Sequence, residues 1–164
     1  MLRLEQAGAD FSEIISELIM ESFSQQAKIL GITEKEYPNF VAFETPGKVS
    51  RRIKRGERVV LGYLLEKPVG TVSYKMDDNA PAKGYIKRLA VLPEFRGKGY
   101  GALLLDYAER RLLECGANRV EISIVAQFRR LMEYYRSLGY RPVEVKVFNT
   151  LPFEVLYLEK TINL

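Results

Sequence analysis

Three alternating glycines, Gly97, Gly99 and Gly101, stand between a segment typical of a strand and a segment typical of a helix. Glycine lets the backbone turn sharply and lets a ligand approach the main chain closely. Backbone N–H groups that converge at the start of a helix form a concave array of donors for anions. Arg96 and Lys98 add two full positive charges beside the glycines. This segment therefore predicts a binding site for a phosphate or pyrophosphate group.

Two well-known phosphate-binding motifs do not match these glycines. A P-loop requires GxxxxGK followed by Ser or Thr, and a dinucleotide-binding fingerprint requires GxGxxG. The spacing here is GxGxG, and Pro93 separates the strand from the glycines. A simpler alternative is that the glycines only shape a loop and a helix start. The combination of strand, proline, arginine and helix favours an anion-binding loop instead.

The residues that are missing exclude other chemistry. Histidine is absent from all 164 residues, which excludes Ser-His-Asp triads, Cys-His dyads and zinc sites built on imidazole. The one cysteine, Cys115, cannot form an internal disulfide or a CxxC metal site, and we interpret it as a packed small residue. We therefore expect no metal and a reducing, cytoplasmic setting.

The glycine-rich segment resembles motif A of the GNAT superfamily of N-acetyltransferases, which reads approximately V-x-P-x-x-R/Q-x-x-G-x-G/A. The matching residues are Val91, Pro93, Arg96, Gly99 and Gly101. The resemblance implies that the loop amides hold the pyrophosphate of acetyl-CoA and that the preceding strand pairs with the pantetheine arm. The cofactor-binding residues that it implies are Leu89, Ala90, Val91, Arg96, Gly97, Lys98, Gly99, Tyr100 and Gly101.

The strand before the loop has an interrupted apolar pattern. Tyr85, Leu89 and Val91 share one alternation phase, Ile86 lies in the other, and the charged pair 87–88 stands between them. A β-bulge permits such a slip. GNAT proteins carry a bulge at this place that separates two parallel strands, so the resemblance implies a bulge here. An ordinary twisted strand is the alternative.

A second segment, residues 131–140, resembles the end of GNAT motif B, A-x-x-x-Y-x-x-x-G-F. Tyr135, Gly139 and Tyr140 occupy the tyrosine, glycine and aromatic positions. Helical spacing places Tyr135, and not Tyr134, on the apolar face. An inward tyrosine near the coenzyme sulfur could protonate the leaving thiolate as a general acid, so Tyr135 is the predicted catalytic residue. A core tyrosine with a satisfied hydroxyl is the alternative.

The sequence departs from the family pattern at two places. Phe128 and Leu131 stand where family members often have asparagine and alanine, with Gln127 as the one polar substitute nearby. Many GNAT enzymes also use a glutamate near the bulged strand as a base, and residues 85–88 contain no acid. The base is therefore left unassigned, with water as one proton acceptor; the glutamates considered as substitutes are Glu66, Glu121 and Glu154.

A basic face is predicted on a short helix that follows Thr45 and Pro46 and ends at Gly56. A threonine N-cap followed by proline at the first helical position is typical of a helix start. The basic residues on this helix are Lys48, Arg51, Arg52 and Arg55. Such a face is usually only solvated, but in GNAT proteins this part of the chain borders the acceptor site. An acidic acceptor or partner is the second interpretation.

The elements that must position these residues follow from hydrophobic periodicity. Strands are expected near residues 1–6, 58–65, 69–76, 84–92, 119–125, 140–148 and 155–160, and helices over 11–23, 46–55, 101–115 and 128–138. Asp10 with Glu13 resembles a capping box at the first helix. This order predicts an α+β, mixed α/β class in a single domain over residues 1–164. The resemblance implies the GNAT-like acyl-CoA N-acyltransferase fold, with a central mixed, mostly antiparallel sheet of about seven strands flanked by four helices.

The prediction for function is an acetyltransferase that uses acetyl-CoA as co-substrate. It would transfer the acetyl group directly to a primary amine of a small molecule or protein, without a covalent enzyme intermediate. The net charge of +4 does not demand nucleic acid, and the apolar runs are too short for a membrane span. Homodimers are common in the family. The alternatives are a non-catalytic acyl-CoA sensor on the same fold and a nucleotide-phosphate binder.

Overall fold

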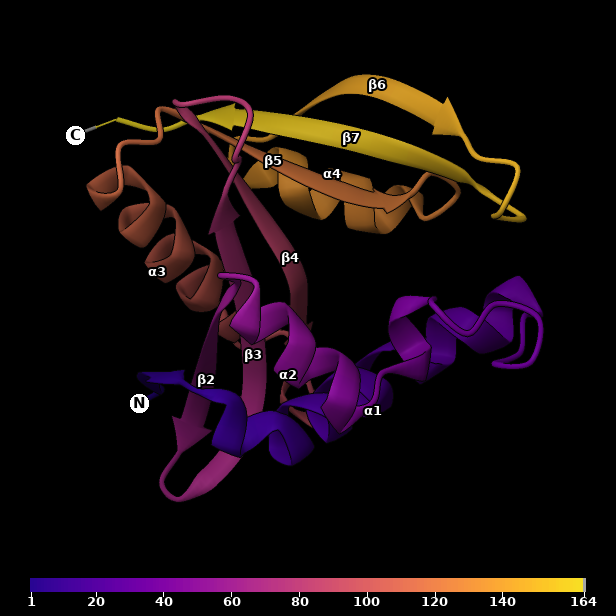
Figure 1. Ribbon diagram of the computed structural model, residues 1–164, viewed down its shortest axis with the longest axis horizontal. Coiled ribbons are helices and arrows are strands. Elements are labelled where there is room, and N and C mark those ends of the chain that lie inside the picture. The colour runs from indigo at the N-terminus through magenta and orange to yellow at the C-terminus, as the bar shows by residue number, and fades with distance from the viewer. Residues whose placement is uncertain (164) are drawn as a thin grey trace. The chain divides into compact units, whose positions relative to one another are not determined.

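The computed structural model describes residues 1–163, in which seven strands and four α-helices follow the predicted order (Figure 1). The strands are β1 (Arg3–Ala7), β2 (Arg58–Leu64), β3 (Lys67–Met76), β4 (Lys83–Val91), β5 (Arg119–Val125), β6 (Arg141–Val147) and β7 (Glu154–Thr161). The helices are α1 (Ser12–Leu30), α2 (Pro46–Lys54), α3 (Tyr100–Glu114) and α4 (Arg129–Ser137). The predicted α+β class is therefore confirmed.

The strands form one hydrogen-bonded sheet in the order β1-β2-β3-β4-β5-β7-β6. Strands β4 and β5 are parallel, whereas the pairs β1–β2, β2–β3, β5–β7 and β6–β7 are antiparallel. A parallel pair requires a long crossover, and α3 supplies it between β4 and β5. The sheet is thus mixed and mostly antiparallel, as expected.

The chain divides into two compact units, and each is described by itself. The first unit comprises residues 1–75 and 88–108, and the second comprises residues 76–87 and the chain from residue 109 onward. The glycine-rich loop and the basic helix belong to the first unit, while Tyr135 belongs to the second.

The core of the first unit lies where α1 and α2 pack against β1 and β2. Ile15, Ile19 and Val49 are fully buried there beside Val59 and Leu61. Burying one such aliphatic side chain stabilises the fold by roughly 1.5–3 kcal/mol. The 3.6-residue spacing of the apolar residues in α1 places them on this one face. The core therefore fixes both helices on the same strands.

The starts of the two helices differ in how well the sequence predicted them. The Thr45 side chain accepts a hydrogen bond from the Lys48 N–H at 3.2 Å, with Pro46 opening α2, so that helix start is confirmed. The predicted Asp10 cap is wrong, because Asp10 lies inside a 3-10 turn and α1 starts at Ser12 behind Phe11. The Phe11 N–H donates to the Gly8 carbonyl at 3.0 Å, which closes that turn before the helix begins.

The second unit is built on the antiparallel strands β5, β7 and β6. The buried residues alternate along β7 and along most of β5, where Val125 is buried next to Ile124, and Val120 and Leu158 are fully buried. A Cβ added at Gly84 of β4 would lie 2.6 Å from Leu112 Cδ2, so only glycine lets the end of α3 pack this closely. No helix within residues 1–163 has the length and apolarity to cross a bilayer.

Leu65 occupies the two-residue turn between β2 and β3 in a left-handed conformation, with φ of 54°. Its side chain is 90% exposed, so it gains little from packing. A non-glycine residue in this conformation costs about 1–2 kcal/mol. We expect Leu65→Gly to raise the free energy of unfolding by about 1 kcal/mol, measured by urea denaturation. Glu66→Gly, at the neighbouring turn position, should instead lower it, and equal effects of the two changes would contradict the explanation.

Candidate active site

The glycine-rich loop between β4 and α3 has two glycines in the left-handed region. A 3-10 turn over Pro93–Phe95 ends β4, and Gly97 and Gly99 follow with φ of 79° and 84°. Residues other than glycine are disfavoured at such angles. The first hydrogen bond that leads into α3 runs from the Leu103 N–H to the Gly99 carbonyl at 3.2 Å. The N–H groups just before it have no acceptor within the helix, so they are available to an anion.

Open space lies in front of both glycines. A Cβ added at Gly97 or Gly99 would meet no atom within 4 Å. At Gly70 of β3, by contrast, an added Cβ would lie 2.9 Å from Leu104 Cδ1 and 3.0 Å from the Ala90 carbonyl oxygen. Packing therefore explains Gly70, whereas the loop glycines are required by their backbone angles and leave room for a ligand beside the main chain.

The Arg96 side chain ties the loop to two other elements. Its Nε donates to the Val91 carbonyl at 2.9 Å, and its Nη2 donates to the Ser22 carbonyl at 2.8 Å. The guanidinium thus connects the loop to the end of β4 and to α1. Sequence reasoning treated Arg96 as a motif A residue and a positive charge beside the glycines, because nothing in the spacing of the motif shows that Ser22 lies beside it. Lys98 is exposed, so its charge is free to face an anion.

The predicted irregularity in β4 is confirmed at Arg88, which has φ of 53° in the middle of the strand. The three residues after it, Leu89, Ala90 and Val91, carry the main chain that the resemblance assigns to the pantetheine arm. Ala90 and Val91 are buried, and the Leu92 N–H donates to the Val69 carbonyl at 2.9 Å. This end of β4 is therefore held firmly between the irregularity and the loop.

Strands β4 and β5 form a short parallel ladder within the second unit. Within the second unit the parallel ladder joins residues 83–85 to residues 119–121 and extends no further, although β5 continues to Val125. A cavity of about 350 Å³ lies beside the end of the ladder. It is lined by Lys83, Tyr85, Ile86, Lys87, Glu121, Ile122, Ser123, Lys146 and Tyr157.

The Tyr85 phenol at this cavity donates a hydrogen bond to Asp77 Oδ2 at 2.7 Å. This hydrogen bond, together with partial burial, raises the pKa of Tyr85 to about 12. The interaction should therefore stabilise the fold fully below the ordinary tyrosine pKa of about 10 and lose that effect as the pH rises through 12.

We expect NMR titration of tyrosine-labelled protein to show one phenol with a midpoint near 12 that is absent in Tyr85→Phe. Asp77→Asn should move this midpoint toward the ordinary value, because the charged acceptor is removed. A midpoint near 10 in the unmodified protein would contradict the assignment.

Tyr135 points into the second unit, as predicted, and Tyr134 does not. Tyr135 is 7% exposed and Tyr134 is 38% exposed. The Tyr135 ring packs edge-on against Tyr134 and Tyr140, with centroid distances of 5.4 and 5.8 Å. Burial raises the pKa of Tyr135, with a smaller contribution from Tyr134, so the phenol keeps its proton at neutral pH.

Tyr140 belongs to a buried polar cluster that sequence reasoning missed. Its hydroxyl donates to Glu109 Oε2 at 2.7 Å, and Lys160 Nζ donates to Glu109 Oε1 at 2.8 Å. Burial and the Glu109 carboxylate raise the pKa of Tyr140. The three residues are far apart in the sequence, so no local pattern could have grouped them. The cluster holds Tyr140 in place against the Tyr135 ring.

The three glutamates considered as bases lie in different surroundings. Glu121 lines the cavity beside the β4–β5 ladder and forms an ion pair with Lys83 at 2.8 Å. Glu66 and Glu154 are exposed, as is Gln127. Glu121 thus lies at a cavity and is partly buried.

Comparison with known proteins gives the family of this chain. A family model described as acetyltransferase (GNAT) family matches residues 15–140. An uncharacterized N-acetyltransferase of Chlorobaculum tepidum is 38% identical over 63 residues, a stretch that spans 38% of this chain and 37% of that relative.

Solved structures share the fold. The PaiA N-acetyltransferase of Thermoplasma acidophilum, in complex with coenzyme A, aligns with a TM-score of 0.80 and 17% identity over 99% of both chains. YncA of Salmonella typhimurium, solved with its cofactor acetyl-CoA, aligns with a TM-score of 0.71 and 17% identity over 99% of this chain and 94% of the other. The loop geometry, the sheet and the family match lead to one conclusion: the chain belongs to the GNAT family of acetyltransferases.

Proposed function

We propose that this chain transfers the acetyl group of acetyl-CoA to a primary amine by direct attack within a ternary complex, with residues 1–164 acting as one catalytic domain. The observation that carries the proposal is the loop at Gly97 and Gly99, where left-handed glycines leave open space before the first N–H groups of α3, which have no acceptor within the helix. This is the arrangement that a diphosphate needs. Two relatives of the same fold were solved with coenzyme A or acetyl-CoA.

The cofactor site in this proposal is made by the end of β4 and the loop. The main chain of residues 89–91 would pair with the pantetheine arm, and residues 96–101 would hold the pyrophosphate. Arg96 contributes by holding the loop against Ser22 and Val91, and Lys98 contributes its charge. The bound coenzyme supplies an activated thioester.

The chemical step forms a C–N bond between the amine and the acetyl carbonyl carbon and breaks the C–S bond. The amine loses one proton, to water or to an acceptor such as Glu121, and the departing thiolate gains one. Tyr135 is proposed to donate the second proton, because it occupies the tyrosine position of the motif, faces inward and carries a protonated phenol at neutral pH. Holding both reactants in one site supplies much of the remaining rate enhancement.

A second candidate function is a non-catalytic acyl-CoA sensor. Two departures from the family pattern favour it: Phe128 and Leu131 replace the usual asparagine and alanine, and residues 85–88 contain no acid. Both functions require the same coenzyme site, so only turnover separates them.

The test combines binding and turnover. Calorimetry with acetyl-CoA, ATP and NAD should show tight binding of acetyl-CoA alone, and preferential binding of ATP would reject the proposal. Thiol release should then be followed with a panel of arylamines, polyamines, amino acids, aminoglycosides and lysine peptides. Thiol release stimulated by at least one amine supports the transferase, whereas binding without stimulated release favours the sensor.

A further inference from the structure

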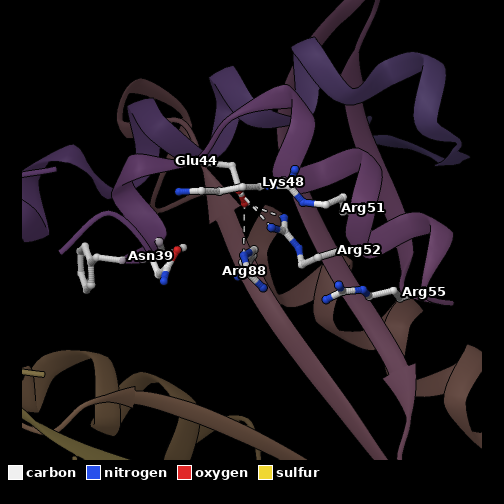
Figure 2. A pocket seen from close by; sticks show the side chains of 9 residues that line it. Asn39, Glu44, Lys48, Arg51, Arg52, Arg55 and Arg88 are labelled. Carbon is white, nitrogen blue, oxygen red and sulfur yellow. Dashed lines mark hydrogen bonds and ion pairs between the residues drawn. The ribbon is translucent and has the colours of Figure 1, made fainter. Parts of the chain in front are cut away.

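A second cavity, of about 200 Å³, lies in the first unit between α2, the segment before it and the irregular residue of β4 (Figure 2). Its lining residues are Asn39, Phe40, Val41, Glu44, Lys48, Arg51, Arg52, Arg55 and Arg88. We call this cavity the basic pocket, because five of these side chains are cationic and one is a carboxylate. Its charge is therefore strongly positive before any ligand enters.

Two of the five cations are neutralised within the protein. Arg52 donates to both oxygens of Glu44, at 2.6 and 3.0 Å, and its Nε donates to Glu57 at 2.8 Å. Arg88 faces the same carboxylates, with Nε 3.3 Å from Glu44 and Nη1 3.9 Å from Glu57 (Figure 2). Glu44 and Glu57 are 4% and 5% exposed, so two partly exposed arginines balance two buried carboxylates.

The positive charges of the other three side chains are not balanced by a nearby carboxylate. Lys48, Arg51 and Arg55 form no ion pair with a carboxylate among residues 1–163. Lys48 Nζ donates to the carbonyls of Phe43, at 3.0 Å, and Pro38, which hold its ammonium group in position. Like charges that gather around a small cavity repel one another, and a bound anion removes that cost.

The backbone conformation at Arg88 would suit glycine better than arginine, so we infer that the Arg88 side chain is needed at this position. Its φ of 53° is an angle that glycine would adopt without the strain of about 1–2 kcal/mol that arginine bears. Its buried Nε–H lies near Glu44 without meeting hydrogen-bond geometry with any acceptor. Burial and the neighbouring charge of Arg52 lower the pKa of Arg88, so an additional negative charge would stabilise its protonated form.

The size of the basic pocket limits what it holds. A volume of about 200 Å³ lies below the usual range of pockets for whole small molecules, so it suits one small polar group and not a whole coenzyme. Planar guanidinium groups match carboxylate and phosphoryl oxygens, with which they form paired hydrogen bonds. Arg88 also directly precedes residues 89–91, the segment proposed to hold the pantetheine arm.

We propose that the basic pocket binds an oxyanion, a carboxylate or a phosphorus oxyanion, carried by the amine that accepts the acetyl group. This inference rests on the proposed function and names the acceptor class: amines that also bear an acidic group. Arg51 and Arg55 contribute charge that no carboxylate among residues 1–163 balances, and Lys48 contributes a positioned ammonium group. Polyamines are disfavoured, because a polycation would be repelled by the same residues.

The experiment compares matched acceptors that differ only in the acidic group: an amino acid, its aminophosphonate analogue and the parent amine. The unmodified protein should use an acidic member with kcat/KM at least about tenfold above that of the neutral amine. Arg51→Gln and Arg55→Gln should each raise KM for the acidic acceptor about tenfold and leave KM for the neutral amine unchanged. Both side chains are on the exposed side of α2, so these variants should fold normally.

Lys54→Gln is the matched control, because Lys54 belongs to the same helix, is exposed and does not line the basic pocket. Its kinetic constants should stay unchanged. Equal use of acidic and neutral acceptors, or an equal loss in Lys54→Gln, would overturn the proposal. Weaker binding of acetyl-CoA by Arg51→Gln or Arg55→Gln, with an unchanged KM for the acceptor, would also overturn the proposal. The pocket would then bind the coenzyme and not the acceptor.

Failure of the proposed function is recognised separately. If no amine is acetylated, calorimetric titration of the same amino acid and aminophosphonate into the protein still tests the pocket. Binding that is lost in Arg51→Gln and kept in Lys54→Gln supports an oxyanion site without acetyl transfer. Absence of binding in the unmodified protein overturns the pocket together with the acceptor class.

Discussion

Tyr135→Phe is expected to lower kcat for acetyl transfer by about 10²- to 10³-fold and to leave the Kd for acetyl-CoA unchanged. The change removes only the hydroxyl that would protonate the departing thiolate. The ring keeps its edge-on contacts with Tyr134 and Tyr140, so the fold should be retained. The measurements are steady-state thiol release and calorimetric binding of acetyl-CoA on the same preparations.

Tyr134→Phe is the matched control for this prediction, because it removes a hydroxyl from the adjacent, half-exposed residue of the same helix. Its kcat should stay within about twofold of the unmodified value. The raised pKa of Tyr135 also predicts that the unmodified enzyme shows no loss of kcat from this group up to about pH 10. Full activity of Tyr135→Phe would show that Tyr135 is only a core residue.

Gly99→Ala is expected to raise the Kd for acetyl-CoA at least about 100-fold. The added methyl group enters the open space beside the loop, and φ of 84° forces the backbone to rearrange. Loss of two hydrogen bonds to a charged phosphate costs about 3 kcal/mol or more, which corresponds to that factor. Calorimetry with acetyl-CoA measures the change directly.

Gly31→Ala separates loss of ligand binding from loss of stability. Gly31 ends α1 with φ of 67°, and an added Cβ there also meets no atom within 4 Å. The two substitutions should lower the free energy of unfolding by a similar amount, about 1–2 kcal/mol. Only Gly99→Ala should weaken coenzyme binding. If both variants bound acetyl-CoA normally, the loop would not be the pyrophosphate site.

The local features of this protein followed from its sequence. The order of elements, the Thr45 cap, the inward face of Tyr135 and the irregularity near Arg88 were all predicted, because each depends on residues within a few positions of one another. The same holds for the glycine-rich loop, since the left-handed angles of Gly97 and Gly99 reflect a conformational preference of glycine itself. The Asp10 cap failed because a competing 3-10 turn has nearly the same local signature.

Only the tertiary structure decided which distant residues act together. Arg96 reaches a carbonyl on α1, Tyr140 shares Glu109 with Lys160, and α2 shares two buried glutamates with Arg88. Residue type and spacing do not encode these contacts, because packing of the apolar core sets the distances between elements. The sequence by itself therefore indicated the candidate coenzyme loop and the candidate catalytic residue, whereas long-range packing placed a basic helix face at a pocket with buried carboxylates.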